Sequence, residues 1–280
     1  MNIKSVMEYM RKNIDKNYKI EEVAKSFGYS KFEFSKKFKN HTGFSASKFL
    51  SFLKIEKALC LMMINNNNVI DTQLKTGYKS SGTFTNLFRR YTGMSPTNYK
   101  RSLKSLYNIL LDYINSTEEG EILPELYFED EKKMISRKKT GNIFTLNLNF
   151  PLNYESEITF IGLFHSPLPD RPPILGKAIV PYKSGNKCVF DDIPDGKYYI
   201  MACSIKRNSH YLDFFDLRNS LRIRLKKPFI FPSDEKNEFT LNFRNSKPTD
   251  FPIILNLPEL VFKIIQSRQN TTMLQVSESL

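Results

Sequence analysis

The sequence predicts an α + β multidomain protein, in which an all-helical N-terminal part is followed by an antiparallel β-sandwich. In the first hundred residues the apolar side chains recur at spacings of three and four, which is typical of amphipathic helices. From Asn142 they alternate with polar side chains, as in Phe144-Thr-Leu-Asn-Leu-Asn-Phe150, and this period of two is typical of strands. The charge also divides the chain, because residues 1–105 contain 20 Lys and Arg against 7 Asp and Glu, whereas residues 106–280 contain 22 of each class. An anionic partner, either nucleic acid or a membrane surface, is therefore expected for the N-terminal part.

Four helices are predicted in the first 64 residues, over Ile3–Asn13, Ile20–Phe27, Lys31–Asn40 and Ser45–Ile64. Gly28 ends the second helix. Ser30, with Glu33 three residues later, forms a capping box that begins the third. The fourth stretch contains no Gly or Pro and is long enough for about 30 Å of helix.

The pattern then recurs after about fifty positions. The segments Gly28-Tyr29, Phe34-x-x-x-Phe38-Lys39 and Thr42-Gly43-Phe44-Ser45 match Gly77-Tyr78, Phe84-x-x-x-Phe88-Arg89 and Thr92-Gly93-Met94-Ser95. A repeat of this kind indicates two copies of one structural unit. Each copy supplies a support helix, a tight turn and a second helix, which are the parts of a helix-turn-helix. The two units are expected at about 20–40 and 69–91. The helix between them is nearly as long as the ~34 Å that separates successive major grooves on one face of DNA.

These residues carry a resemblance to a known family. Residues 3–104 resemble the DNA-binding domain of the AraC/XylS family of bacterial transcriptional regulators. The match rests on Ala24-x-x-x-Gly28-Tyr29-Ser30, on Phe34-Ser35-Lys36-Lys37-Phe38-Lys39, and on the run from Phe84 to Arg101 with Gly93-Met94-Ser95-Pro96 at its centre. The resemblance implies a cytoplasmic, sequence-specific regulator of transcription that places two recognition helices in successive major grooves. Double-stranded DNA is the implied partner, with RNA polymerase as a further candidate.

The resemblance also implies which side chains face DNA. In the first copy these are Phe32, Ser35, Lys36 and Lys39, and in the second they are Ser81, Gly82, Thr83, Thr85 and Asn86. Lys37, Arg89 and Arg90 suit phosphates, which fix register without reading sequence. Phe32 suits a thymine methyl group, Lys36 a guanine edge and Asn86 an adenine edge, although Phe32 could equally pack inside the protein. The apolar members of the repeat, Phe34, Phe38, Phe84 and Phe88, are expected in the core.

Two features depart from the family pattern. Thr72-Gln73 stand where the second support helix usually has Ile-Ala, and Gly82 gives the second reading helix little side chain at an exposed position. Both suggest that the first copy discriminates between DNA sequences more than the second.

Beyond residue 105 the sequence predicts a helix extension and linker over 106–141, a β-sandwich over 142–248 and a partly frayed C-terminal segment over 249–280. The turn Ile193-Pro194-x-Gly196, followed by Tyr198-Tyr199, resembles small transthyretin-like or Cna-B-like sandwiches. Such a module is expected to sense a ligand or a protein partner, or to mediate self-association.

Other functions have less support in the sequence. Asp191, Asp192 and Asp195 flank a turn, where Asp is favoured for local hydrogen bonding, so an enzyme is not expected. Three scattered His make a metal site improbable, and no cofactor is indicated. Cys188 and Cys203 fit small core residues, with a redox pair on neighbouring strands as the alternative. No segment is long and apolar enough to span a membrane. A catalytic C-terminal domain targeted to DNA, and a non-specific architectural DNA binder, remain as alternatives to the regulator.

Overall fold

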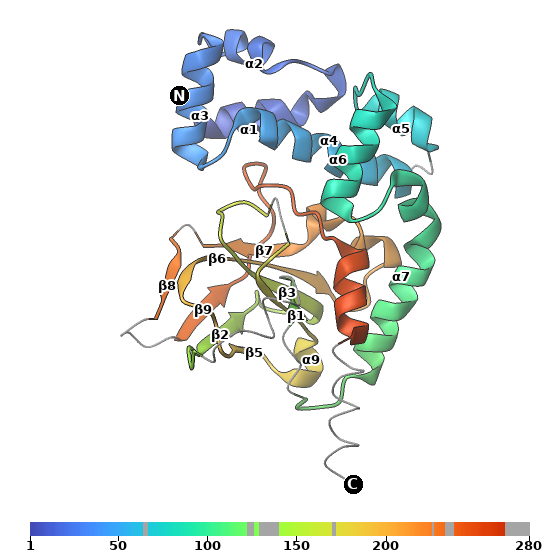
Figure 1. The fold of residues 1–280 in the computed structure, drawn as a ribbon, viewed down its shortest axis with the longest axis vertical. Coiled ribbons are helices and arrows are strands. Elements are labelled where there is room, and N and C mark those ends of the chain that lie inside the picture. The colour runs from blue at the N-terminus through green and yellow to red at the C-terminus, as the bar shows by residue number, and fades with distance from the viewer. Residues whose placement is uncertain are drawn as a thin grey trace. The chain divides into compact units, whose positions relative to one another are not determined.

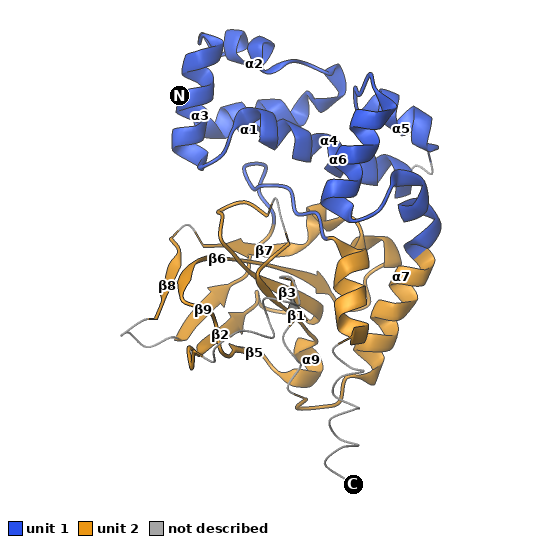
Figure 2. Cartoon of the chain, viewed as in Figure 1, with its two compact units in different colours: residues 1–103, 246–255 blue, residues 104–245, 256–280 orange. Residues whose placement is uncertain are grey.

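A computed structural model describes residues 1–63, 67–121, 126–128, 140–169, 172–225, 227–232 and 238–266. Ile64, residues 122–125 and 129–139 of the predicted linker, and the end of the C-terminal segment, residues 267–280, lie outside these residues. The chain forms two compact units (Figure 2): a helical unit of residues 1–103 and 246–255, and a sheet unit of residues 104–245 and 256–280. The predicted fold class, helices followed by β-sheets, is confirmed.

The helical unit contains the predicted helices in the predicted order (Figure 1). They are α1 (Ile3–Lys12), a 3-10 turn (Ile14–Lys16), α2 (Ile20–Ser26), α3 (Lys31–Thr42), α4 (Ala46–Met63), α5 (Val69–Lys75), α6 (Ser81–Thr92) and the first part of α7 (Pro96–Ser116). Phe34, Phe38, Phe84 and Phe88 are all 0% exposed, so the interpretation of the repeated Phe pair as core is confirmed. The Phe34 and Phe38 rings lie 5.9 Å apart and the Phe84 and Phe88 rings 5.8 Å apart, so the two copies build the same local core.

The central helix α4 is apolar on most of its sides. Phe49, Phe52, Ile55 and Ala58 are fully buried, and α4 contacts α3, α5 and α6. A helix buried all round belongs to the interior of a domain rather than to its surface. The sequence signal for this arrangement is the long stretch without Gly or Pro that separates the two copies.

Residues 246–255 belong to the helical unit, although the sequence predicts them at the end of the sandwich and the start of the C-terminal segment. Figure 2 shows this stretch in the colour of the helices. Phe251 accounts for the difference, because its ring lies 4.4 Å from that of Phe52 and 4.9 Å from that of Phe44. Burying an aromatic ring there removes more than 150 Å² from water, which no boundary estimate from local composition takes into account.

The sheet unit contains two sheets in the part of the chain that the structure describes. The first has the order β1 (Leu126–Tyr127), β4 (Leu175–Ile179), β3 (Ser156–Phe164), β6 (Gly196–Lys206) and β7 (Leu221–Arg224), with β8 (Phe229–Phe231) also paired to β6. The second has the order β5 (Lys187–Phe190), β2 (Phe144–Asn149) and β9 (Glu238–Asn242). The ladders are antiparallel except that β2 and β9 run parallel, with Leu146 opposite Phe239. Buried and exposed side chains alternate along β2, as its sequence predicts.

Helical elements complete the sheet unit. They are the remainder of α7, α9 (Pro181–Ser184), two 3-10 turns (Tyr211–Phe214 and Leu217–Asn219) and a helix over residues 257–266. Tyr113 of α7 donates a hydrogen bond to the carbonyl of Ala178 at 2.6 Å. The Lys183 ammonium donates to the carbonyls of Ile114, Asn115 and Thr117 at 2.8–3.0 Å, a favourable position for a cation at a helix C-terminus. Among the described residues, no helix is both long and apolar enough to cross a bilayer.

Cys188 and Cys203 lie in different sheets. Cys188 is on β5, which pairs with β2, whereas Cys203 is on β6, which pairs with β3, β7 and β8. The alternative of a redox pair on neighbouring strands is therefore wrong, and both thiols are buried. Burial raises the pKa of the Cys203 thiol to about 12, because the thiolate would lose its hydration there.

We expect Cys203 to resist alkylation in the folded protein. Only the thiolate attacks iodoacetamide, and at pH 8 a thiol with a pKa of about 12 is about one ten-thousandth ionised. Peptide mass spectrometry after a short exposure should find Cys203 unmodified in the native protein and modified in 6 M guanidinium. Equal labelling under both conditions would show that the thiol is accessible.

Candidate nucleic-acid interface

The two recognition helices begin with the same device. The Ser30 hydroxyl accepts a hydrogen bond from the amide of Glu33 at 3.2 Å, and the Ser80 hydroxyl accepts one from the amide of Thr83 at 3.3 Å. An oxygen at this position satisfies one of the free amides of a first helical turn, so each serine fixes where its helix starts. The Ser30 cap is the predicted one, but the predicted capping box is incomplete, because the Glu33 carboxylate accepts from the Ser30 hydroxyl at 3.3 Å and not from its backbone amide. In the second copy the cap is Ser80, and Ser81 is the first helical residue.

The two helices also end in the same way. Gly43 and Gly93 both have φ of +82°, in the left-handed region that terminates helices. The hydroxyl of Thr42 donates to the carbonyl of Phe38 at 2.7 Å, and that of Thr92 donates to the carbonyl of Phe88 at 2.8 Å. The sequence repeat is thus a structural repeat at both ends of the helix.

Residues 31–40 and 81–90 have the same order of burial, position by position. In both, the first three side-chain positions are exposed, the fourth and eighth are buried, and the sixth, ninth and tenth are exposed. Lys36 therefore corresponds to Asn86, and Lys39 to Arg89. One face of each helix is fixed in the core by its Phe pair, and the opposite face is directed to solvent.

Most of the side chains that the family resemblance implies lie on these exposed faces. Exposed in the structure are Phe32, Lys36, Lys39, Ser81, Gly82, Thr83, Asn86, Arg89 and Arg90, and partly exposed are Ser35, Lys37 and Thr85. Phe32 is 77% exposed, which removes the alternative that it packs inside the protein. An exposed benzyl group contributes no free energy of burial to the fold. The Phe32 side chain can therefore be buried by a binding partner instead.

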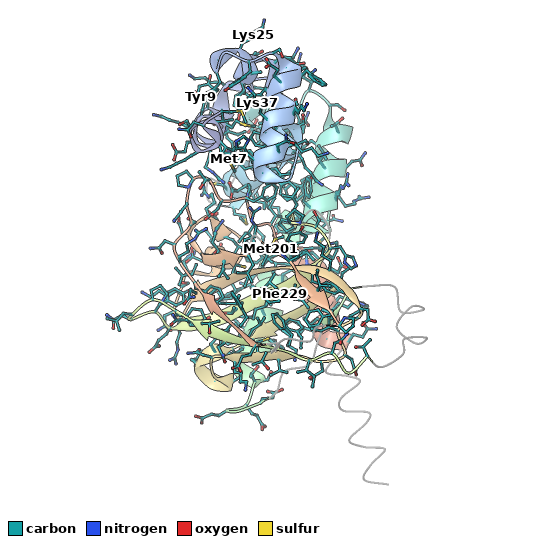
Figure 3. The ribbon with its side chains drawn as sticks, turned by 90° about the vertical axis from the view of Figure 1, so that its left-hand side faces the viewer. Met7, Tyr9, Lys25, Lys37, Met201 and Phe229 are labelled. Carbon is teal, nitrogen blue, oxygen red and sulfur yellow. The ribbon has the colours of Figure 1, made fainter. Side chains whose placement is uncertain are left out.

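Lys37 differs from the other basic side chains of α3. Its ammonium lies 4.5 Å from the ring centroid of Tyr29, in the turn before the helix. Lys37 is labelled among the side chains of the helical unit in Figure 3. Such a cation–π contact holds the charge close to the protein. Lys31 forms an ion pair with Glu21, which neutralises it locally.

The remaining cations of the two faces are Lys36, Lys39, Arg89 and Arg90. They form no ion pair with any residue that the structure describes. Lys39, Arg89 and Arg90 lie in the last turns of their helices, where they also interact favourably with the helix dipole. The charge of both faces is positive and uncompensated, as an anionic ligand requires.

A polar contact links the turn of the second copy to the central helix. Lys54 of α4 donates to the Asn17 side-chain oxygen at 2.9 Å, and its ammonium lies 5.2 Å from the ring centroid of Tyr78. Burial lowers the pKa of Lys54. Gly77 has φ of +73°, and the Asn17 amide occupies the position that a Cβ at Gly77 would take. Sequence reasoning did not find Asn17 or Lys54, because neither belongs to the repeat.

The unusual Thr72-Gln73 pair has a local explanation. Thr72 is fully buried, and its hydroxyl donates to the carbonyl of Asn68 at 2.8 Å. The Gln73 side chain donates to the carbonyl of Tyr78 at 3.1 Å, across the turn. A buried polar group costs little when its hydrogen bonds are made, so these residues support the second turn. Gly82 remains the departure that affects the exposed face.

Part of the chain is similar to known proteins. Residues 23–102 match the family model described as "Helix-turn-helix domain". The Transposon Tn10 TetD protein of Escherichia coli is 26% identical over 100 residues, which are 36% of this chain and 72% of TetD. The raffinose operon transcriptional regulatory protein RafR of Pediococcus pentosaceus is 39% identical over 66 residues, which are 24% of each chain. The solved DNA-binding domain of AdpA, a global transcriptional factor in complex with a target DNA, is 20% identical with a TM-score of 0.35, and the match covers 37% of this chain and 93% of that one.

The N-terminal part of the chain therefore contains a helix-turn-helix domain. The family model covers residues 23–102, and the chain spans about a quarter of the length of RafR. The resemblance of the sheet unit to transthyretin-like or Cna-B-like sandwiches is not confirmed by them.

Proposed function

We propose that this protein is a sequence-specific regulator of transcription that reads two successive major grooves with α3 and α6. The observation that carries the proposal is the position-by-position identity of burial along residues 31–40 and 81–90, combined with uncompensated positive charge on both exposed faces. A major groove admits one α-helix, whose exposed side chains reach the base edges. A single chain with two such faces can occupy two grooves without dimerising.

The exposed side chains divide by chemistry. Arg89, Arg90 and Lys37 are assigned to phosphates, which contribute salt-dependent affinity without sequence information. Phe32, Lys36 and Asn86 are assigned to a thymine methyl, a guanine edge and an adenine edge. Ser35, Lys39, Ser81, Gly82, Thr83 and Thr85 complete the two proposed faces.

The relatives support transcription as the process that this DNA binding serves, since RafR is a transcriptional regulatory protein. Cytoplasmic location and contact with RNA polymerase follow from the same proposal. The sheet unit is proposed to sense a ligand or a protein partner. Its supporting feature is its separate core, which gives it the independence expected of an effector module.

Selection of duplexes from a random library by the full-length chain tests the proposal. A regulator should enrich one bipartite sequence and bind it at least ~10³-fold more tightly than random duplex at the same salt concentration. Binding that is equal for all duplexes would instead show a non-specific architectural protein. No binding to any duplex would overturn DNA binding altogether.

A substitution pair tests the assignment of bases. Replacing Lys36 with alanine should relax sequence preference at one base pair by about 1–3 kcal/mol. Replacing Asn86, at the equivalent position of α6, should cost less, because Gly82 leaves the second face with fewer contacts around it. The selection, repeated with each variant, measures both losses. Equal losses would contradict the unequal contribution of the two copies.

A further inference from the structure

The ten residues 246–255 complete the core of the helical unit from a distant part of the sequence. Phe251 is 6% exposed, and its ring centroid lies 4.9 Å from that of Phe44, 5.8 Å from that of Phe49 and 4.4 Å from that of Phe52. Two of these contacts are edge-on, at interplanar angles of 79° and 65°, the arrangement that aromatic pairs favour. The family model ends at residue 102, so this segment lies outside the matched domain.

Arg11 holds the segment in place. Its guanidinium donates to the carbonyl of Pro248 at 3.2 Å and to that of Asp250 at 2.9 Å, and it forms an ion pair with Glu56 at 2.5 Å. One planar side chain thus connects the end of α1, the middle of α4 and the segment. The turn before Phe251 is also closed, because the amide of Lys247 donates to the Asp250 carboxylate at 2.7 Å.

A single intervening aromatic side chain separates Phe251 from each recognition helix. On one side, Phe44 and Phe49 both contact Phe38, in the core of α3, at 5.8 and 6.0 Å. On the other side, Phe52 contacts Tyr91, near the end of α6, at 4.2 Å. A chain of packed aromatic rings therefore runs from α3 through Phe251 and the central helix to α6. Close-packed interiors transmit a change in one side chain to its neighbours.

We propose that Phe251 is a positioning residue that holds α3 and α6 in the relation needed to bind both half-sites at once. This inference rests on the proposed function, since it assigns a role in the same DNA interface. Neither Phe251 nor Arg11 lies on the exposed faces of α3 and α6. Their effect is exerted on the geometry between the faces and leaves the chemistry of each face unchanged.

The energetic consequence follows from bivalent binding. Once one face is bound, the second half-site is present at a high effective concentration only if the second face already points at it, and the resulting gain is commonly 10²–10⁴-fold. When the relation between the faces loosens, this gain falls, while each face keeps its own affinity. Loss of Phe251 should therefore affect a full site much more than a half-site.

The experiment uses the duplex obtained by the selection and two versions of it, each with one half-site scrambled. The full-length protein and its Phe251→Leu, Phe251→Val and Phe251→Ala variants are titrated against all three. We expect the ratio of full-site to half-site affinity to fall in that order, by at least tenfold for alanine, and half-site affinity to change less than twofold. Leucine should retain most of the ratio, because it keeps most of the buried volume.

Phe160→Leu is the matched control, because Phe160 has the same 6% exposure but belongs to the sheet unit. It should leave the ratio unchanged. If Phe251→Ala does not fold, as judged by circular dichroism, the leucine and valine variants still test the order. A ratio that stays constant along the series, or an equal loss on full and half-sites, overturns the positioning role. Failure to select any duplex overturns the proposed function instead, and the two failures are distinguishable.

Discussion

Replacing Phe52 with alanine should lower the free energy of unfolding of the helical unit by about 3–5 kcal/mol. The Phe52 side chain is fully buried, and its ring contacts Tyr91 of α6 at 4.2 Å and Phe251 at 4.4 Å. Removing the ring forfeits its burial and leaves a cavity between elements that come from three parts of the sequence. Since domains are stable by only about 5–15 kcal/mol, the loss is a large fraction of the total.

Hydrogen exchange measured by mass spectrometry reports this loss for α4 and α6 separately from the sheet unit. The unfolding of the two units therefore need not be treated as a single transition. Phe32→Ala is the matched control, since it removes the same ring from a side chain that is 77% exposed. It should change stability by less than about 0.5 kcal/mol. Similar losses for the two variants would mean that Phe52 is not part of the core.

Gly77→Ala should destabilise the protein more than Gly28→Ala does, by about 0.5–1.5 kcal/mol. The two glycines occupy equivalent turns with the same φ of +73°, so alanine meets the same backbone strain at both. At Gly28 a Cβ meets nothing within 4 Å, whereas at Gly77 it would overlap the Asn17 side chain. Alanine at Gly77 therefore displaces the Asn17 side chain and weakens its solvent-exposed hydrogen bond to the Lys54 ammonium, a bond of roughly 0.5–1.5 kcal/mol.

Urea unfolding followed by circular dichroism gives both losses, and a double substitution locates the cause. The double variant Asn17→Ala/Gly77→Ala should lose less stability than the sum of the two single variants, because the amide that alanine at Gly77 displaces is already absent. Strictly additive effects, or equal losses of stability at the two glycines, would show that backbone strain alone determines how much alanine destabilises these turns.

The helical unit was largely predictable from the sequence because its signals are local. Capping serines, terminating glycines and Phe pairs four residues apart specify each helix within a few residues of itself, and the repeat doubles the evidence. The exposure of Lys36 and Asn86 follows directly from the burial of their Phe neighbours. The alternation along β2 predicted its buried face for the same reason.

The features that sequence reasoning missed all depend on residues far apart in the chain. Phe251 is one aromatic residue in an irregular segment, and nothing in its local pattern distinguishes a place among helices from a place in a β-sandwich. The parallel pairing of β2 with β9 likewise joins strands about ninety positions apart. Asn17 and Lys54 meet only because a turn and a helix pack together, and contacts of this kind have no periodic signature.

The division of the helical unit between residues 1–103 and 246–255 constrains how the protein is made. Domains generally fold in order from the N-terminus as they leave the ribosome, at about 5–20 residues per second. Here residues 1–103 lack Phe251 until the whole intervening sheet region has been translated, roughly 7–30 s later at that rate. Newborn chains therefore carry an unfinished aromatic core, and DNA competence should arise only after residues 246–255 have left the ribosome.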